Sequence, residues 1–162
     1  MAKHPEPDLK KINEKALYGK WGRPMYPIEF AYMERDPAML QKFIDAGADV
    51  NIDLGEGWTL LHELCAMAID ATIQNRRDDF YPHHMEMIKI LLANGADLHK
   101  KDIKGDKPLD VINLYPHEDI EQFDNMVSLF IPAIPNAADL ISYENNSWHK
   151  IKNQPPHNGE GR

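Results

Sequence analysis

Apolar residues along this chain recur at the spacing of helix faces, in short segments separated by polar turns. The longest pattern follows Thr59 and contains Leu60, Leu61, Leu64, Cys65, Ala68, Ile69, Thr72 and Ile73. Apolar positions three and four residues apart fall on one side of an α-helix. Two further helical patterns open at Tyr26-Pro27-Ile28 and at Lys107-Pro108-Leu109. The patterning therefore predicts an all-α fold, with a long helix after Thr59.

One segment of the chain occurs twice. Residues 43–51, Phe-Ile-Asp-Ala-Gly-Ala-Asp-Val-Asn, recur as residues 91–99, Leu-Leu-Ala-Asn-Gly-Ala-Asp-Leu-His. Gly47 and Gly95 stand where a helix has to stop, because glycine readily adopts the left-handed conformation that closes a last helical turn. Each unit is thus a helix, a turn, a second helix and a returning loop. Two short helices cannot bury all their apolar surface alone, so we expect the pairs to stack.

The spacing of these motifs shows that the middle unit is longer than the first. Ile28 and Leu61 are 33 residues apart, whereas Leu61 and Leu109 are 48 residues apart. The two glycines of the repeated segment are also 48 residues apart. The 15 extra residues all lie between the first and second helices of the middle unit. We expect this insertion to lengthen the first of these two helices.

These motifs resemble ankyrin repeats. The resemblance rests on the 33-residue period, on Gly-Trp-Thr-Leu-Leu-His at 57–62, on Gly-Asp-Lys-Pro-Leu-Asp at 105–110 and on the two Gly-Ala-Asp turns, and it covers about Pro24 to Ile131. It implies a short solenoid of about three helix pairs that binds another protein. It also implies that the loops between pairs, called fingers, line the concave binding face together with the first helices, and that sheet is limited to short hairpins in the fingers.

The outer repeats depart from the ankyrin signature Thr-Pro-Leu-His. The signature is replaced by Tyr-Pro-Ile-Glu at Tyr26, Thr-Leu-Leu-His at Thr59 and Lys-Pro-Leu-Asp at Lys107. We therefore interpret the first and third repeats as degenerate. At the histidine position, the resemblance implies that His62 makes a structural hydrogen bond near Thr59.

The segments outside the repeats are interpreted as caps of a single domain spanning residues 1–152. Apolar residues at 9, 12, 16 and 17 predict an amphipathic N-terminal capping helix over residues 8–18. The last repeat ends with a helix near 118–131, and residues 132–152 form a C-terminal cap with a short helix at 136–143. Residues 153–162 lack apolar anchors and are expected to be a disordered tail.

Charge narrows the choice of partner. The chain has 18 Lys and Arg against 26 Asp and Glu, a formal net charge of −8. This charge repels phosphate backbones, so nucleic acid is not expected as a partner, whereas a basic protein is. No segment approaches the roughly 20 apolar residues of a membrane span, and the first eight residues lack a signal core. We expect a cytoplasmic protein without a membrane partner.

No motif for catalysis or for a cofactor stands out. Cys65 lies in an apolar run and is expected to fill a core position. His62 and Cys65 are three residues apart, and His83-His84 could add ligands to a zinc site, but no second Cys or paired-His motif completes four ligands. We therefore expect no metal, no cofactor and no enzymatic activity. A small metal-dependent or hydrolytic enzyme remains as a remote alternative.

Two segments are candidate contacts for a protein partner. Residues 29–63 contain eight acids and two bases, and the insertion ends in a charged loop with two adjacent aromatics. Exposed aromatics beside charges are common in interfaces, and complementary charge speeds association. The alternatives are an acidic face that is simply solvated, and aromatics that fold back onto the core. The candidate partner-binding residues are Asp53, Glu56, Trp58, Glu63, Asp78, Asp79, Phe80 and Tyr81.

The size, acidity and irregular insertion of the chain suggest a particular kind of binding protein. Our first hypothesis is an inhibitor similar to the small bacterial ankyrin-like immunity proteins, which neutralise a secreted toxin by binding it. The second is an ankyrin adaptor or regulatory subunit of a housekeeping protein. A gene for a large toxin beside this one would favour the first hypothesis.

Overall fold

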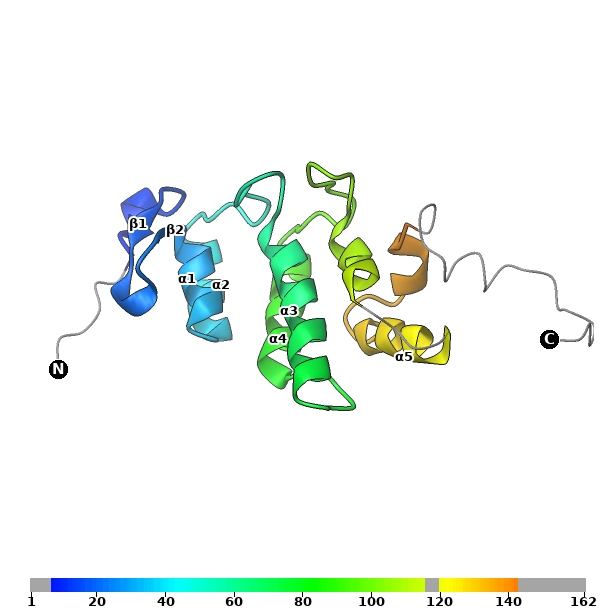
Figure 1. Cartoon of the computed structure of the whole chain (residues 1–162). Helices are drawn as coiled ribbons and strands as arrows, with labels where there is room; N and C mark the ends of the chain where they lie inside the picture. The colour runs from blue at the N-terminus through cyan, green and yellow to red at the C-terminus, as the bar shows by residue number, and fades with distance from the viewer. Residues whose placement is uncertain (1–6, 116–119, 143–162) are drawn as a thin grey trace, which may run out of the picture.

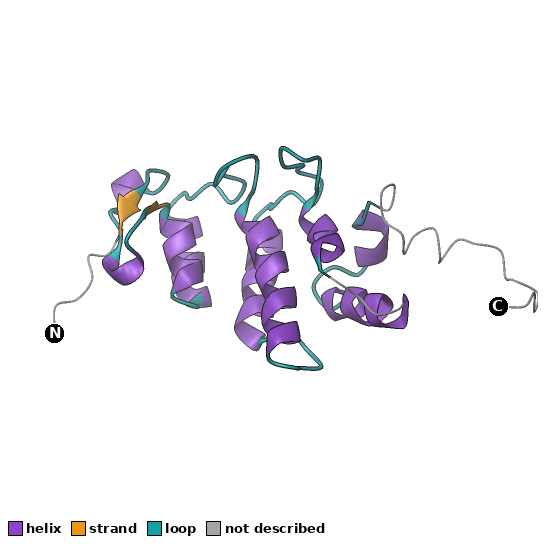
Figure 2. Cartoon of the chain, viewed as in Figure 1, coloured by secondary structure: helices purple, strands orange, loops and turns teal. Residues whose placement is uncertain are grey.

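A computed structural model describes residues 7–115 and 120–142, and these residues form a row of packed helices (Figure 1). Helices predominate in these two ranges, as the sequence predicts, and the sheet found there is small, with two short strands (Figure 2). The α-helices are α1 (Pro27–Met33), α2 (Pro37–Asp45), α3 (Leu60–Gln74), α4 (Pro82–Ala93) and α5 (Ile120–Phe130). The 3₁₀ helices are η1 (Leu9–Lys11), η2 (Gly19–Trp21), η3 (Pro108–Leu114) and η4 (Ala137–Leu140), and the strands are β1 (Ala16–Leu17) and β2 (Pro24–Met25).

The helices are arranged as successive pairs. Helix α1 packs against α2 and α3 against α4, while α2 packs on α4 and α3 packs on η3, so that neighbouring pairs share one core. Helix η3, followed by α5, occupies the place of a third pair (Figure 1). Two loops connect the pairs on one side of the row: the first finger (residues 46–59) and the second finger (residues 94–107).

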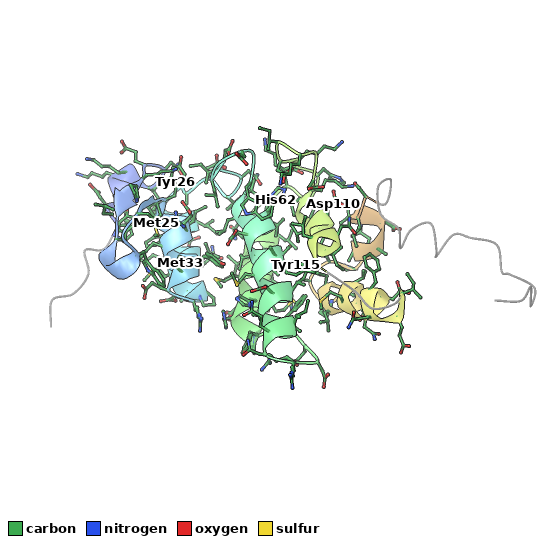
Figure 3. All side chains as sticks on the ribbon, viewed as in Figure 1. Met25, Tyr26, Met33, His62, Asp110 and Tyr115 are labelled. Carbon is green, nitrogen blue, oxygen red and sulfur yellow. The ribbon has the colours of Figure 1, made fainter. Side chains whose placement is uncertain are left out.

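The first helix of each pair begins with the same hydrogen bond, although the residues differ. The fourth side chain of the signature accepts a hydrogen bond from the backbone N–H of the first residue. The acceptors and donors are Glu29 and Tyr26 at 3.0 Å, His62 and Thr59 at 3.1 Å, and Asp110 and Lys107 at 2.8 Å. Figure 3 shows Tyr26, His62 and Asp110 at the finger end of their helices. The residues that replace the signature histidine therefore still provide an acceptor for a backbone N–H that has no partner within the helix.

His62 also joins two successive units. Since Nδ1 accepts from the Thr59 N–H, Nδ1 carries no proton, and Nε2–H donates to the Asp106 carbonyl in the second finger at 2.9 Å. The Thr59 hydroxyl lies 2.8 Å from the same Nδ1 and is its second donor. The structural hydrogen bond that the resemblance implied is confirmed.

Asparagine amides form a second link between units. Asn51 Nδ2 donates to the carbonyl of Gly95 at 3.0 Å, and its Oδ1 accepts from the N–H of Asp97 at 2.8 Å. Both partners belong to the repeated Gly-Ala-Asp turn, where Gly95 has a φ of 90°. The turn glycine is therefore in the left-handed conformation that the sequence predicted.

The predicted capping helix over residues 8–18 is wrong. This segment contains η1 and then β1, which pairs antiparallel with β2. The reason lies in Asn13, which donates to the carbonyl of Gly47 at 3.1 Å and accepts from the N–H of Asp49 at 2.8 Å. These are the two bonds that Asn51 makes one unit later. The N-terminal segment therefore continues the finger pattern, and the tertiary hydrogen bonds of Asn13 take precedence over local helix propensity.

The 15-residue insertion is divided among three parts of the middle pair. Helix α3 has 15 residues where α1 has seven, and α4 has 12 where α2 has nine. The remaining four residues lie in the α3–α4 loop, residues 75–81, which replaces the three-residue loop 34–36. The predicted long helix is confirmed, and eight of the inserted residues belong to it. At 1.5 Å per residue, α3 extends about 12 Å farther than α1 does.

The C-terminal elements match the prediction in part. The helix expected near 118–131 is α5, and the one expected at 136–143 is the shorter η4. The third pair begins with a 3₁₀ helix that stops at Leu114, because Tyr115 precedes Pro116 in the sequence and is extended, with φ −105° and ψ 141°. The rest of the predicted cap, to 152, and the predicted tail 153–162 lie outside the described residues.

Candidate protein-binding surface

The first finger owes its shape to Asp53. Its Oδ1 accepts hydrogen bonds from the backbone N–H groups of Gly55, at 2.7 Å, and Gly57, at 3.0 Å. Glu56 lies between them with a φ of 55° and an exposed side chain. The carbonyl oxygen of Glu56 accepts from the N–H of Ile103 at 2.8 Å, which joins the first finger to the second. The two predicted acids of this loop are therefore exposed, but one of them also holds the backbone together.

Trp58 and Glu63 form one hydrogen-bonded unit. Trp58 Nε1 donates to Glu63 Oε2 at 2.8 Å, while the Tyr32 hydroxyl donates to Glu63 Oε1 at 3.3 Å. The indole ring lies 4.9 Å from the His62 ring, centroid to centroid. Burial, followed by the charge of Glu63, raises the pKa of Tyr32 well above its ordinary value. A half-buried tryptophan in a fixed orientation loses little conformational entropy on binding a partner.

A groove of about 390 Å³ lies between the two fingers. Its lining combines apolar side chains with acids, and two of the apolar side chains, Ile103 and Leu114, are 72% and 59% exposed. Burial and then the charges of Asp102 and Asp110 raise the pKa of Asp106. The lining residues are Leu54, Gly55, Glu56, Trp58, Asp102, Ile103, Lys104, Asp106 and Leu114. We call this the finger groove.

The sequence reasoning missed half of this groove. It selected the first finger by its acids and its tryptophan, but it did not select Ile103 or Asp102 in the second. A signal was present, since the second finger follows the second Gly-Ala-Asp turn as the first finger follows the first. Ile103 is an aliphatic residue in the segment 99–107, whose other residues are polar or glycine, and this points to a surface contact or to packing.

The second predicted contact group lies in the α3–α4 loop and divides into exposed and buried residues. Asp78 and Asp79 are exposed, and Asp79 pairs with Arg77 at 3.1 Å. Phe80, by contrast, is 5% exposed, and its ring packs edge-on against Phe130 at 4.7 Å. The alternative stated above, in which an aromatic folds back onto the core, is therefore what the structure shows for Phe80.

Tyr81 is half-buried and differs from its neighbour. The Arg77 guanidinium carbon lies 4.0 Å from the centroid of its ring, and the rings of His83 and His84 lie 5.6 and 6.0 Å away. Tyr81 therefore remains partly accessible, whereas Phe80 belongs to the core.

The two predicted contact groups lie at opposite ends of α3. The fingers are at one end of the helix and the α3–α4 loop is at the other (Figure 1). A 15-residue helix is about 22 Å long. A partner that contacts both groups must therefore cover the length of α3, and the structure does not bring the eight residues into one patch.

The described residues hold no group of three or more His, Cys, Asp and Glu that is arranged to bind a metal. Both ring nitrogens of His62 are already used in hydrogen bonds, as given above. Cys65 is fully buried, and burial raises the pKa of its thiol far above the ordinary value. This confirms its predicted core position. Among the helices of the described ranges, none has the length and apolar character needed to span a bilayer.

Comparison with known proteins agrees with this geometry for the middle of the chain. The family model for the ankyrin repeat matches residues 56–103, which run from the first finger through α3 and α4 into the second finger. This match supports placing the chain among ankyrin-repeat proteins, whose repeats are generally protein-protein interaction modules. A search of curated proteins found no match to the chain.

Proposed function

We propose that this protein neutralises a secreted toxin by binding a basic surface of it on the finger side of the helix row. The observation that carries this proposal is the finger groove, where a fixed Trp58 and two exposed aliphatic side chains lie beside three acids, Glu56, Asp102 and Asp106, and one base, Lys104. Two further acids adjoin the groove, since Asp53 holds the first finger and Glu63 accepts a hydrogen bond from Trp58. Apolar contacts at the centre and acids around them are the usual layout of an interface that binds a basic partner. About three repeats, with caps at both ends, form the scaffold.

The second candidate is an adaptor or regulatory subunit of a housekeeping protein. The second contact group favours it, since Asp78 and Asp79 are exposed and Tyr81 is partly accessible at the far end of α3, away from the finger groove. An adaptor holds two partners at once. A small inhibitor needs only one surface.

Affinity capture from the host tests the proposal. The bait is the full chain, and the matched baits are Trp58→Ala in the finger groove and Glu86→Gln on α4, an exposed side chain away from the groove. We expect one basic protein to bind the wild type and Glu86→Gln but not Trp58→Ala. The toxin hypothesis requires that the captured protein, expressed alone, stops growth of the host, and that co-expression of the chain restores growth.

The results separate the candidates. A captured protein that is not toxic supports the adaptor hypothesis. Equal capture by the wild type and by Trp58→Ala would show that the finger groove is not the binding surface.

A further inference from the structure

The insertion produces a step in the row of helices, and a pocket lies at this step. Since α3 and α4 extend beyond α1 and α2, their extra turns and their loop form a wall beside the α1–α2 turn. The pocket has a volume of about 420 Å³. Its lining residues are Trp21, Tyr32, Met33, Arg35, Met67, Ala71, Asn75, Tyr81, His83 and His84. We call it the step pocket, and it is separate from the finger groove.

The charge of the step pocket is opposite to that of the whole chain. The chain has a net charge of −8, yet the lining contains an arginine and two histidines and no carboxylate. Within the described residues, the guanidinium of Arg35 forms no ion pair and no side-chain hydrogen bond. Arg35 also has a φ of 55°, a conformation that costs free energy for a residue other than glycine. Arg35 is exposed, so an anion that enters the pocket can pair with its guanidinium.

The two histidines supply a second, independent sign of a missing partner. His84 is only 5% exposed, and neither its Nδ1 nor the Nε2 of His83 has a hydrogen-bond partner within the described chain. A buried polar atom without a partner destabilises the folded protein, so such atoms in native proteins usually have one. Both nitrogens are covered in this structure, so contact with a ligand requires the imidazole rings to rotate.

The remaining lining residues of the step pocket are mostly aromatic and methionine side chains, which suit an apolar group. Trp21, Tyr32 and Tyr81 contribute ring surfaces, and Met33 and Met67 contribute flexible thioethers that adapt to an apolar group. The volume of the pocket lies within the range of about 300–1,000 Å³ that is usual for small-molecule sites. The lining is thus divided into a cationic part and an aromatic part.

We propose that the step pocket binds a carboxylate attached to an aromatic or other apolar group. Arg35 holds the carboxylate as an ion pair, the imidazoles donate hydrogen bonds to it, and the aromatic and methionine side chains surround the apolar group. Two sources supply this chemistry: the C-terminal residue of a protein partner, or a free aromatic acid. The site does not depend on the finger groove, so either proposal can fail alone.

A titration of the full chain with a simple probe tests the site. The probe is 3-phenylpropanoate, and its control is 3-phenylpropanamide, which has nearly the same shape without the charge. Using ¹⁵N-labelled protein, we expect saturable shifts of the backbone signals around residues 33–35, 71–75 and 81–84. We expect the amide to bind about tenfold more weakly or worse, because it loses a charge-assisted contact.

A pair of matched variants identifies Arg35 as the cation. Arg35 and Arg76 both lie at the C-terminal end of the first helix of their pair, with φ values of 55° and 51°, but Arg76 does not line the step pocket. Asparagine tolerates this backbone conformation. We expect Arg35→Asn to weaken binding of the acid about tenfold or more and Arg76→Asn to leave it unchanged. Equal affinities of the two variants, or equal binding of acid and amide by the wild type, would overturn the proposal.

The histidines provide a readout that a merely apolar cavity would not give. The groups that face them are Arg35 from the α1–α2 turn, Tyr32 from α1, Tyr81 from the α3–α4 loop, and the two imidazoles of α4 themselves. Arg77 lies over the Tyr81 ring. Burial lowers the pKa of both histidines, and for His84 the pKa falls to about 4. A bound carboxylate favours the protonated imidazole, so the pKa of His84 should rise in the complex, and the acid should bind more tightly at pH 5 than at pH 7.5. An unchanged imidazole pKa would exclude contact between ligand and histidines.

Two peptides distinguish the sources. Acetyl-Ala-Ala-Phe with a free C-terminal carboxylate is compared with its C-terminal amide and with 3-phenylpropanoate. If the free peptide binds more tightly than the small acid, the ligand is a protein C-terminus. If the small acid binds and the free peptide does not, the ligand is a free aromatic acid. If neither the free peptide nor the small acid binds, the proposal that the step pocket binds a carboxylate is wrong.

Discussion

At the scale of single residues, the helix starts show which property of the ankyrin signature matters physically. Glu29, His62 and Asp110 differ in charge and size, yet each accepts a hydrogen bond from a backbone N–H at the start of its helix. All three side chains are buried, at 6%, 0% and 1% exposed. The outer repeats, interpreted from the sequence as degenerate, therefore retain this hydrogen bond, and only the residue that accepts it differs from the histidine of the signature.

Two glycines with positive φ should respond differently to the same substitution. A Cβ at Gly57 (φ 77°) would lie 2.9 Å from the Asp102 Cα, whereas a Cβ at Gly95 (φ 90°) would meet nothing within 4 Å. Gly95→Ala should therefore cost only the backbone strain, about 1 kcal/mol. Gly57→Ala should cost about 2–3 kcal/mol, since the second finger must also move. Urea unfolding of both variants measures the difference, and equal losses would show that the fingers are not in contact.

His84 should make the stability of the protein depend on pH. Its pKa is about 4 in the folded protein, against an ordinary value of 6.5, because it is buried and lies beside His83 and Arg35. Between pH 6.5 and 4 the unfolded chain binds a proton at this site that the folded protein does not, so the free energy of unfolding falls as the pH falls.

The matched pair for this prediction is His84→Gln and His99→Gln. His99 is exposed, and its replacement should leave the pH profile of the wild type unchanged. His84→Gln should flatten the profile between pH 6.5 and 4, by up to about 1 kcal/mol per pH unit. Denaturant unfolding at several pH values measures it, and parallel profiles for all three proteins would contradict the low pKa of His84.

At the scale of secondary-structure elements, periodicity predicted what local sequence determines and failed where tertiary contacts decide. The length of α3 followed from an apolar pattern that continues to Ile73, and the turn glycines followed from the repeated segment. The N-terminal segment has an equally regular pattern, but Asn13 bonds to Gly47 and Asp49 and prevents a helix. The sequence did hold a hint, since Ile12-Asn13 is similar to Val50-Asn51, whose asparagine makes the corresponding two hydrogen bonds.

The α3–α4 loop should contribute to stability through one of its two aromatics. Phe80 packs against Phe130 of α5, so Phe80→Ala should lower the free energy of unfolding by about 3 kcal/mol. Tyr81→Ala removes a half-buried ring and should cost about 1 kcal/mol. In Phe80→Ala, hydrogen exchange should also accelerate in α5, because the loop no longer supports that helix. A change confined to the loop would show that α5 is held by its other contacts alone.

At the scale of the whole molecule, the candidate surfaces are distributed in a way that one sequence could not reveal. The finger groove needs residues from two fingers 48 positions apart, and the step pocket needs the α1–α2 turn beside the start of α4. The sequence identified Asp53, Glu56, Trp58 and Glu63 by composition, because charge and aromatic content are visible residue by residue. Which of them share a cavity depends on how the pairs stack. Tyr81, which the sequence suggested as a partner contact, also lines the step pocket.

The kinetics of binding should separate the contribution of charge from that of Trp58. Because Asp53 Oδ1 holds the first finger, a charge reversal there would disturb the loop, whereas Asp53→Asn retains an acceptor for the two N–H groups. The double variant Asp53→Asn, Glu56→Gln should therefore slow association with a basic partner and flatten its salt dependence, with little effect on dissociation. Trp58→Ala should instead speed dissociation about 30-fold, the equivalent of 2 kcal/mol.

The control for the charge variant changes the net charge by the same amount elsewhere. Asp45→Asn with Glu86→Gln removes two exposed acids from α2 and α4, the second helices of their pairs. If steering depends on acids near the groove, this control should associate almost as fast as the wild type, since charges more than about 10 Å from the interface are screened at ordinary salt. Equal slowing by both double variants would mean that only the total charge of the protein matters, and that the fingers do not orient the partner.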